Sequence, residues 1–294
     1  MVMEKVVQRM TADAEGAEEA RQKILRQLKH AEQRIRDLED HFNGIDADGS
    51  GDVSQEGLGN KGQRSMTEKE YRQSRFERPP GSTEILLVRH GESRAARVEQ
   101  PFPLVDGQGD PELAPDGKQQ AIRVGSRLAH LAIDAVYVTK LRRTAETAAP
   151  LCEYLGLTPT LDPDLHEIHL GDWEGGLLRM KAHENDPIFQ QMLSLERWDV
   201  VPGAEPGQAF QERVMRGIRN IARANPDRLV AAFVHGGVIG KVLATITESR
   251  PFAFNGADNG SISNIVVDSE RIVLRRFNDT AHLGRESSGL QLPT

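Results

Sequence analysis

The sequence has little of what marks secreted and membrane proteins. It contains a single cysteine, Cys152, among 294 residues, which excludes an intramolecular disulfide and suits a reducing compartment. No apolar run approaches the roughly 20 residues that cross a bilayer. The first twenty residues also lack the basic-then-apolar order of a signal peptide. We therefore expect a cytoplasmic protein with no membrane partner.

An excess of positive charge is also absent. Lys and Arg total 37 against 44 Asp and Glu, which gives a formal net charge of −7 at pH 7. A protein that binds nucleic acid needs positive charge to neutralise phosphates, so we expect no nucleic acid partner. Any anion site must be a local concentration of cations. The 38% of hydrophobic residues is enough for a sizeable core.

An amphipathic helix is predicted near the amino terminus, over residues 17–42. Its apolar residues are spaced alternately by four and three positions: Ile24, Leu28, Ala31, Ile35, Leu38 and Phe42. This heptad spacing predicts either a homodimeric coiled coil or a single helix that packs against the rest of the chain. The sequence does not decide between the two.

The segment IDADGSGDVSQEGL, residues 45–58, resembles the calcium loop of an EF-hand. Oxygen-bearing side chains stand at alternate positions: Asp46, Asp48, Ser50 and Asp52. The twelfth position, where a bidentate glutamate belongs, is Gly57, with Glu56 one residue early. This departure favours a weak or absent calcium site over a working one.

Composition divides the chain into four regions. These are a helical segment with the EF-hand-like loop (1–56), a flexible linker that is polar and rich in glycine (57–83), a folded domain (84–283) and a flexible tail (284–294). In the folded domain, short apolar strands alternate with amphipathic helices. This alternation predicts an α/β fold with a mostly parallel sheet.

Three apolar strands are each followed by a cationic or titratable residue and a helix start. EILLV leads into RHGES, DAVYVTK into LRRTAETAAPL, and LVAAFV into HGGVIG. Ligands of open α/β sheets bind beyond the carboxyl ends of the strands. We therefore expect these ends to place four side chains around one anion site: Arg89, His90, Arg143 and His235.

Two histidines and two arginines without clustered aspartates suit a phosphoryl group and need no metal. Arginine offers a planar, permanently charged fork to phosphate oxygens. A neutral histidine can attack phosphorus, and a second, protonated histidine can hold the charge that develops on the oxygens. Gly91, Gly236 and Gly237 would let the backbone approach with free amide protons.

The motif RHGES resembles the signature of the histidine phosphatase superfamily, which includes the cofactor-dependent phosphoglycerate mutases. The resemblance covers about residues 84–283, and further motifs follow in the family's order. They are ELAPDGKQQA (112–121), TKLRRTAETA (139–148), LHEIHLGDWEG (165–175), VPGAEPGQAFQER (201–213) and FVHGGVIG (233–240). LHEIHLGDWEG is closest to the broad-specificity phosphatase branch. The resemblance implies a three-layer sandwich, with the sheet flanked by helices and a helical extension in front.

The resemblance also implies a site and a reaction. His90 would be the nucleophile, Glu167 the proton donor and His235 the second catalytic histidine. Arg89, Arg143, Gly91 and Gly236 would bind the substrate phosphate. The reaction would be hydrolysis of a small phosphorylated metabolite through a phosphohistidine, with no cofactor for catalysis.

Two alternatives stay open at this point: a cofactor-dependent phosphoglycerate mutase, and a phospho-ligand-binding scaffold or calcium-responsive regulator with a weakly active phosphatase domain. One departure bears on them, because many members of the family have an asparagine where this chain has Ala96. We expect either that Arg94 or Arg97 substitutes for this asparagine or that the pocket binds phosphate less tightly. His166 and His169 flank Glu167, but no third zinc ligand is evident, so we interpret them as structural or rim residues.

Overall fold

The computed structural model describes residues 73 and 75–284. The predicted helix over 17–42, the calcium-type loop with Asp46, Asp48, Ser50 and Asp52, and most of the linker and tail lie outside the described residues. The homodimer and calcium predictions are therefore untested by the structure.

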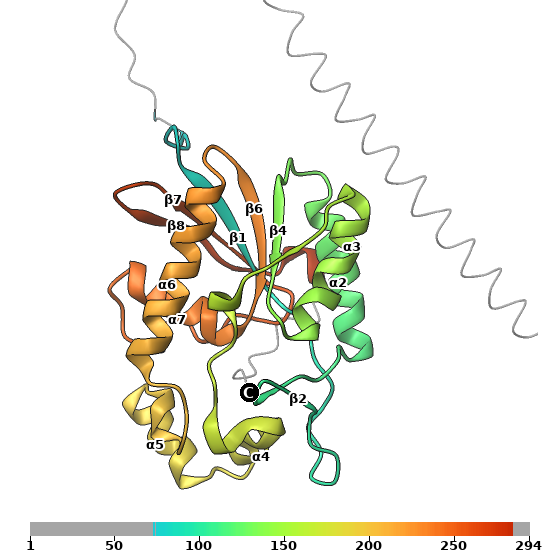
Figure 1. Cartoon of the computed structure of the whole chain (residues 1–294), viewed down its shortest axis with the longest axis vertical. Coiled ribbons are helices and arrows are strands. Elements are labelled where there is room, and N and C mark those ends of the chain that lie inside the picture. The colour runs from blue at the N-terminus through green and yellow to red at the C-terminus, as the bar shows by residue number, and fades with distance from the viewer. Residues whose placement is uncertain (1–72, 74, 285–294) are drawn as a thin grey trace, which may run out of the picture. The chain divides into compact units, whose positions relative to one another are not determined.

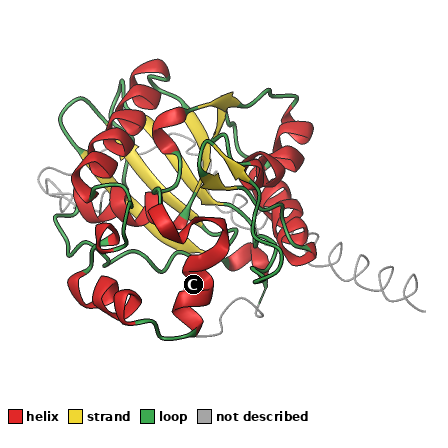
Figure 2. Ribbon diagram, turned by 60° about the horizontal axis from the view of Figure 1, so that its bottom comes forward, coloured by secondary structure: helices red, strands yellow, loops and turns green. Residues whose placement is uncertain are grey.

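The described part of the chain is a central sheet with helices on both of its faces (Figures 1 and 2). The strands are β1 (Thr83–Arg89), β2 (Leu104–Val105), β3 (Gln108–Gly109), β4 (Ala135–Val138), β5 (Thr160–Leu161), β6 (Leu229–Val234), β7 (Ile262–Val267) and β8 (Ile272–Asp279). The α-helices are α2 (Pro115–Leu128), α3 (Arg142–Leu155), α4 (Leu177–His183), α5 (Pro187–Leu195), α6 (Gly207–Ala224) and α7 (Gly236–Ile246). Short 3₁₀ turns are η2 (Pro163–Leu165), η3 (Gly171–Gly176), η4 (Trp198–Val200) and η5 (Ala281–Leu283).

Six strands form the sheet in the order β5-β4-β6-β1-β7-β8. The pairs β4–β5, β4–β6 and β1–β6 are parallel, whereas β7 is antiparallel to both of its neighbours. Strands β2 and β3 form a separate hairpin. The predicted α/β fold with a mostly parallel sheet flanked by helices is confirmed.

Alternation along the strands explains the layers. Ile85 and Leu87 belong to the apolar cluster that contains α6 and α7, whereas Leu86 and Val88 belong to the cluster that contains α2 and α3. Successive side chains of a strand point to opposite faces, so a continuous apolar run is what a sheet covered on both faces requires. Figure 1 shows the two helix pairs on opposite sides of the sheet.

The chain is attached to the domain several residues before the first strand. Two guanidinium nitrogens of Arg78 donate to the carbonyl oxygens of Arg228 (2.8 Å) and Asp227 (2.6 Å), and the Gly81 amide donates to the Asp227 carboxylate at 2.6 Å. Thr83 is fully buried at the start of β1. The last residues of the predicted linker thus contact the folded domain.

No helix within the described ranges combines the length and the apolar character that crossing a membrane requires.

Packing of α2 on α3 generates a prediction about stability. A β-carbon added at Gly125 would lie 2.9 Å from Pro150 Cβ and 3.1 Å from the Leu151 amide nitrogen. We expect Gly125→Ala to lower the free energy of unfolding by about 1–3 kcal/mol, because overpacking displaces one helix from the other. The control Gly207→Ala meets nothing within 4 Å and should be neutral or slightly stabilising. Urea denaturation measures both, and equal effects of the two variants would contradict this account.

Candidate active site

His90 lies at the carboxyl end of β1 and is 5% exposed. Its Nδ1 is 2.7 Å from the Gly91 carbonyl oxygen, so Nδ1 carries the proton. Its Nε2 accepts a hydrogen bond from Arg143 Nε at 3.1 Å, which assigns the lone pair to that nitrogen. Burial, reinforced by the charges of Arg143 and Arg89, lowers the pKa of His90 well below 6.5. The geometry therefore gives a neutral imidazole with a nucleophilic Nε2.

Gly91 differs from expectation. Its amide donates to Thr147 Oγ1 at 3.0 Å, and its carbonyl oxygen accepts a hydrogen bond from His90 Nδ1. A β-carbon at this position would lie 2.5 Å from the Gly117 carbonyl oxygen on α2. The prediction of a free Gly91 amide for phosphate is thus wrong. A glycine is needed at position 91 because the segment that follows β1 passes close to α2. This close approach positions the backbone of His90.

Arg89 and Arg143 flank His90 without a carboxylate partner of their own. Arg143 Nη1 donates to the Gly109 carbonyl at 2.9 Å, and Arg89 Nη1 donates to the Ala257 carbonyl. Burial lowers the pKa of Arg143 to about 10 and also lowers the pKa of Arg89, so Arg143 stays charged at neutral pH. Arg89 Nε is buried with no hydrogen-bond partner in the described part of the chain. Two guanidinium groups are therefore available to an anion beside Nε2.

His235 is the N-cap of α7 and is fully buried, with its ring centroid 5.2 Å from that of His90. Its Nε2 is 3.0 Å from Thr139 Oγ1. Burial, followed by the charge of Arg143, lowers the pKa of His235 well below 6.5. Burial thus favours the neutral form of His235, and its protonation during the reaction stays a proposal. A phosphate dianion in contact with the ring would favour its protonation.

Glu167 is held by two backbone amides. Oε1 accepts from the Ile168 amide at 3.0 Å, and Oε2 accepts from the Gly237 amide at 3.2 Å. Burial raises the pKa of this carboxyl above its usual value, although these hydrogen bonds and Arg143 oppose the shift. A β-carbon at Gly237 would lie 2.5 Å from Oε1. Gly237 therefore orients the carboxyl group and does not offer a free amide.

Gly236 is the first residue of α7, so its amide has no carbonyl partner within the helix. A β-carbon there would lie 3.3 Å from Arg89 Nε. Gly236 therefore stands beside an arginine at a helix N-terminus, as an anion site requires.

A cavity of about 130 Å³ lies beside His90 and is lined by the residues that contact or flank it. Arg89, Arg143 and Glu167 line it. The β2–β3 hairpin covers one side, where Gln108 Nε2 donates to the Glu167 carbonyl oxygen at 2.7 Å. The cavity is small beside the several hundred Å³ of typical ligand pockets. It suits a phosphoryl group with a short substituent.

The sequence analysis missed Gln108 and Arg179, which also line the cavity. It proposed Arg94 or Arg97 in place of the family's asparagine, but Arg94 pairs with Glu112 at 3.3 Å and Arg97 is exposed. A β-carbon at Gly176 would lie 3.0 Å from Ala96 Cβ. Ala96 thus packs against the turn before α4, the helix that supplies Arg179. Neither Arg94 nor Arg97 therefore takes the place of the family's asparagine. The sequence does not reveal Arg179, because the contacts that place it at the cavity join residues far apart in the chain.

His166 and His169 are engaged by the backbone. His166 Nε2 accepts from the Lys140 amide at 3.1 Å, and His169 Nδ1 accepts from the Gly171 amide at 3.0 Å. Burial lowers the pKa of His166 to about 4. Over the described ranges, no group of three or more His, Cys, Asp or Glu side chains could hold a metal ion. Both imidazoles therefore stabilise the local backbone by accepting hydrogen bonds from it.

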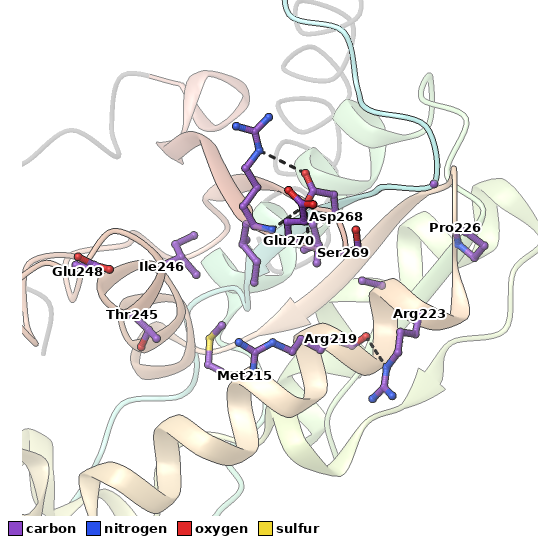
Figure 3. Close-up of a pocket in the computed structure, with 15 residues that line it drawn as sticks. Met215, Arg219, Arg223, Pro226, Thr245, Ile246, Glu248, Asp268, Ser269 and Glu270 are labelled. Carbon is purple, nitrogen blue, oxygen red and sulfur yellow. Dashed lines mark hydrogen bonds and ion pairs between the residues drawn. The ribbon is translucent and has the colours of Figure 1, made fainter.

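A larger depression of about 960 Å³ lies away from this site, between α6, α7 and the β7–β8 turn (Figure 3). It is next to Gly81, at the amino end of β1, whereas His90 follows the carboxyl end. Of its arginines, Arg271 pairs with Asp268 at 3.5 Å and Arg223 is bonded within α6. Its lining contains none of the predicted catalytic residues.

The fold and this site agree with comparisons to known proteins. The family profile described as histidine phosphatase superfamily (branch 1) matches residues 85–280, and the chain belongs to that family. The chain is 31% identical to phosphoglycerate mutase-like protein 4 of Arabidopsis thaliana over 207 residues, 68% of this chain and 86% of that protein. It is 26% identical to the metal-independent phosphoserine phosphatase of the same plant over 209 residues, 68% of this chain and 83% of that protein.

Among solved structures, the mycobacterial glucosyl-3-phosphoglycerate phosphatase has the same fold. The TM-score is 0.57 at 24% identity, with 68% of this chain and 100% of that chain covered. The chain is thus an enzyme of the histidine phosphatase class.

The lowered pKa values generate a prediction about pH and stability. An unfolded histidine binds a proton near pH 6.5, whereas folded His90 and His235 do not. The unfolded chain therefore binds more protons below that pH, and the free energy of unfolding should decrease as the pH falls, by about 1 kcal/mol per histidine between pH 7 and 5.5. His90→Asn should reduce this decrease by about 1 kcal/mol. Denaturation at several pH values tests this, and an unchanged slope in the variant would contradict it.

Proposed function

We propose that the protein hydrolyses phosphate monoesters of small metabolites through a phosphohistidine at His90. One observation carries the proposal: the unprotonated Nε2 of His90 lies beside two arginines that lack carboxylate partners, and these arginines line a cavity together with Glu167. This combination supplies a nucleophile, an anion site and an acid.

The first step forms the bond between Nε2 and phosphorus and breaks the ester P–O bond. Arg143 transfers its hydrogen bond from Nε2 to a phosphoryl oxygen, and Arg89 and the Gly236 amide contact the others. Glu167, whose pKa is raised by burial, gives its proton to the departing alkoxide. His235 takes up a proton from solvent as the phosphate dianion binds, stabilises the equatorial oxygens, and releases the proton to solvent when phosphate leaves.

The second step returns the enzyme to its starting state. The Glu167 carboxylate takes a proton from a water molecule, which attacks phosphorus and breaks the P–N bond. Inorganic phosphate leaves, and the lone pair returns to Nε2. The Gly91 carbonyl holds the Nδ1 proton throughout, so one tautomer serves both steps.

The mechanism uses no cofactor, because the arginines stabilise the phosphoryl charge that a metal ion stabilises in other phosphatases. The name of one relative, metal-independent phosphoserine phosphatase, supports this reading. It also supports small phosphorylated metabolites as substrates. A mutase would have to keep water from the phosphohistidine, and a scaffold would not need the acid. No feature of the site favours either alternative.

Three further expectations remain proposals of their own. Asp46, Asp48, Ser50 and Asp52 would bind calcium weakly, and the heptads of residues 17–42 would pair in a homodimer. The supporting observations are the alternate acidic positions and the four-three spacing. The single cysteine supports a cytoplasmic location.

Phosphate release from p-nitrophenyl phosphate in EDTA tests the proposed function. The wild type should turn over without metal, and His90→Ala should lose at least about 1,000-fold in kcat because it lacks the nucleophile. The exposed His130 provides a control, since His130→Ala should retain full activity. Metal dependence, or activity retained in His90→Ala, would contradict the mechanism.

The acid role of Glu167 predicts a dependence on the leaving group. Glu167→Gln cannot donate a carboxyl proton, so kcat for an alkyl phosphate should fall about 100- to 10,000-fold. p-Nitrophenolate leaves without protonation, and its phosphate ester should lose less than about tenfold in the first step. Single-turnover kinetics with both esters measures this. Equal losses would assign Glu167 a different role.

A further inference from the structure

Glu174 lines the cavity together with Glu167, and the mechanism above does not use it. Both of its carboxylate oxygens accept hydrogen bonds from backbone amides. Oε1 accepts from Leu170, at the start of the same η3 turn, at 2.8 Å, and Oε2 accepts from Gly109, in β3, at 2.7 Å. A carboxylate at an anion site weakens binding of the anion through charge repulsion. The contribution of Glu174 must therefore come from the backbone that it holds in place.

Strand β3 consists of two residues, and both of them contact groups of the candidate active site. The Gly109 carbonyl oxygen accepts a hydrogen bond from Arg143 Nη1 at 2.9 Å, while Arg143 Nε donates to His90 Nε2 at 3.1 Å. Gln108 Nε2 donates to the Glu167 carbonyl oxygen at 2.7 Å. The position of β3 therefore affects the arginine beside the nucleophile directly, and it also affects the backbone of the proposed proton donor.

Strand β3 pairs with β2 outside the six-stranded sheet, and a two-stranded hairpin has little stability of its own. Two carboxylates attach it to the rest of the domain. Glu174 attaches it to η3, and Asp110 attaches it to α3, because Asp110 Oδ1 accepts a hydrogen bond from the Arg142 amide at 2.7 Å. A β-carbon at Gly109 would lie 3.3 Å from the Gly175 amide nitrogen and 3.4 Å from Glu174 Oε2. The backbone of β3 therefore lies directly against η3, and the Glu174 carboxylate fixes this contact.

We propose that Glu174 is a positioning residue for phosphoryl transfer: it holds β3 so that the Gly109 carbonyl orients the Arg143 guanidinium beside His90 Nε2. This inference rests on the proposed function. Without the carboxylate, the Gly109 amide loses its acceptor and β3 loses its attachment to η3. Arg143 keeps its charge and can still bind an anion, but its direction is no longer fixed. A misplacement of about 1 Å costs on the order of 100-fold in rate, so the effect falls on the reaction step and not on anion affinity.

Glu174→Gln separates the rate from the affinity. An amide of the same shape offers one acceptor and one donor group, so it cannot accept from both backbone amides. We expect the single-turnover rate constant for p-nitrophenyl phosphate, measured with saturating enzyme in excess, to fall about 10- to 100-fold. This rate constant does not depend on the fraction of folded enzyme. The inhibition constant of inorganic phosphate should stay the same or decrease, because the variant lacks one negative charge at the anion site.

Two further variants test the path of the effect. Asp172→Asn removes an exposed carboxylate of the same turn that accepts no hydrogen bond within the described part of the chain, and it should keep the wild-type rate constant within about twofold. Gly109→Val places a branched side chain in the contact between β3 and η3, and it should lower the rate constant at least about tenfold. The double variant Gly109→Val/Glu174→Gln should lose little more than the slower single variant, because both changes act through one contact.

Three results would overturn the inference: a wild-type rate constant in Glu174→Gln, a change confined to the inhibition constant of phosphate, or losses that multiply in the double variant. The second would mean that Glu174 only repels anions, and the third that it acts independently of Gly109. Failure of the proposed function looks different, since His90-dependent turnover of p-nitrophenyl phosphate would then be missing from the wild type itself.

Discussion

The site depends on one hydrogen bond, from Nδ1 of His90 to the Gly91 carbonyl. It fixes the tautomer and therefore gives Nε2 its lone pair. The bond in turn requires the backbone of Gly91 to lie against Gly117 and its amide to reach Thr147. β1, α2 and α3 are therefore joined at this glycine. The reactivity of one nitrogen is a consequence of how three elements pack.

A second constraint is the concentration of cations in a chain with a net charge of −7. Arg89, Arg143 and Arg179 line a common cavity, and burial lowers the pKa of each. Burying like charges together opposes folding, so this arrangement is a local cost that the large core offsets. Burial, followed by these charges, keeps His90 unprotonated. The electrostatics that destabilise the free site thus prepare it for an anionic ester.

The sequence alone predicts the strands of the sheet and the meeting of the two histidines. Apolar runs at 85–88 and 229–234 predicted buried strands, and the residues that follow them, His90 and His235, meet with ring centroids 5.2 Å apart. The hydrogen-bond partners of the glycine amides could not be predicted. The Gly91 amide donates to Thr147 and the Gly237 amide to Glu167, and both partners are distant in the sequence. The roles assigned to the site residues remain proposals.

Arg179 escaped prediction for a similar reason. No pattern in GGLLRM distinguishes an arginine that faces a cavity from one that faces solvent. The small residue that accommodates its helix, Ala96, lies 83 residues earlier in the chain. The lowered pKa of His235 could not be predicted either, because the sequence does not report how deeply a residue is buried. Loops and burial are long-range properties, whereas strand and helix patterns are local.

The central claim is that phosphoryl transfer passes through Nε2 of His90. Rapid acid-free quenching of the enzyme with a ³²P-labelled phosphate monoester, followed by peptide mapping, tests it most directly. The account predicts an acid-labile, alkali-stable label on the peptide that contains His90, located at Nε2, which appears before phosphate is released. Turnover with no label, or a label at Nδ1 or on another residue, would contradict it.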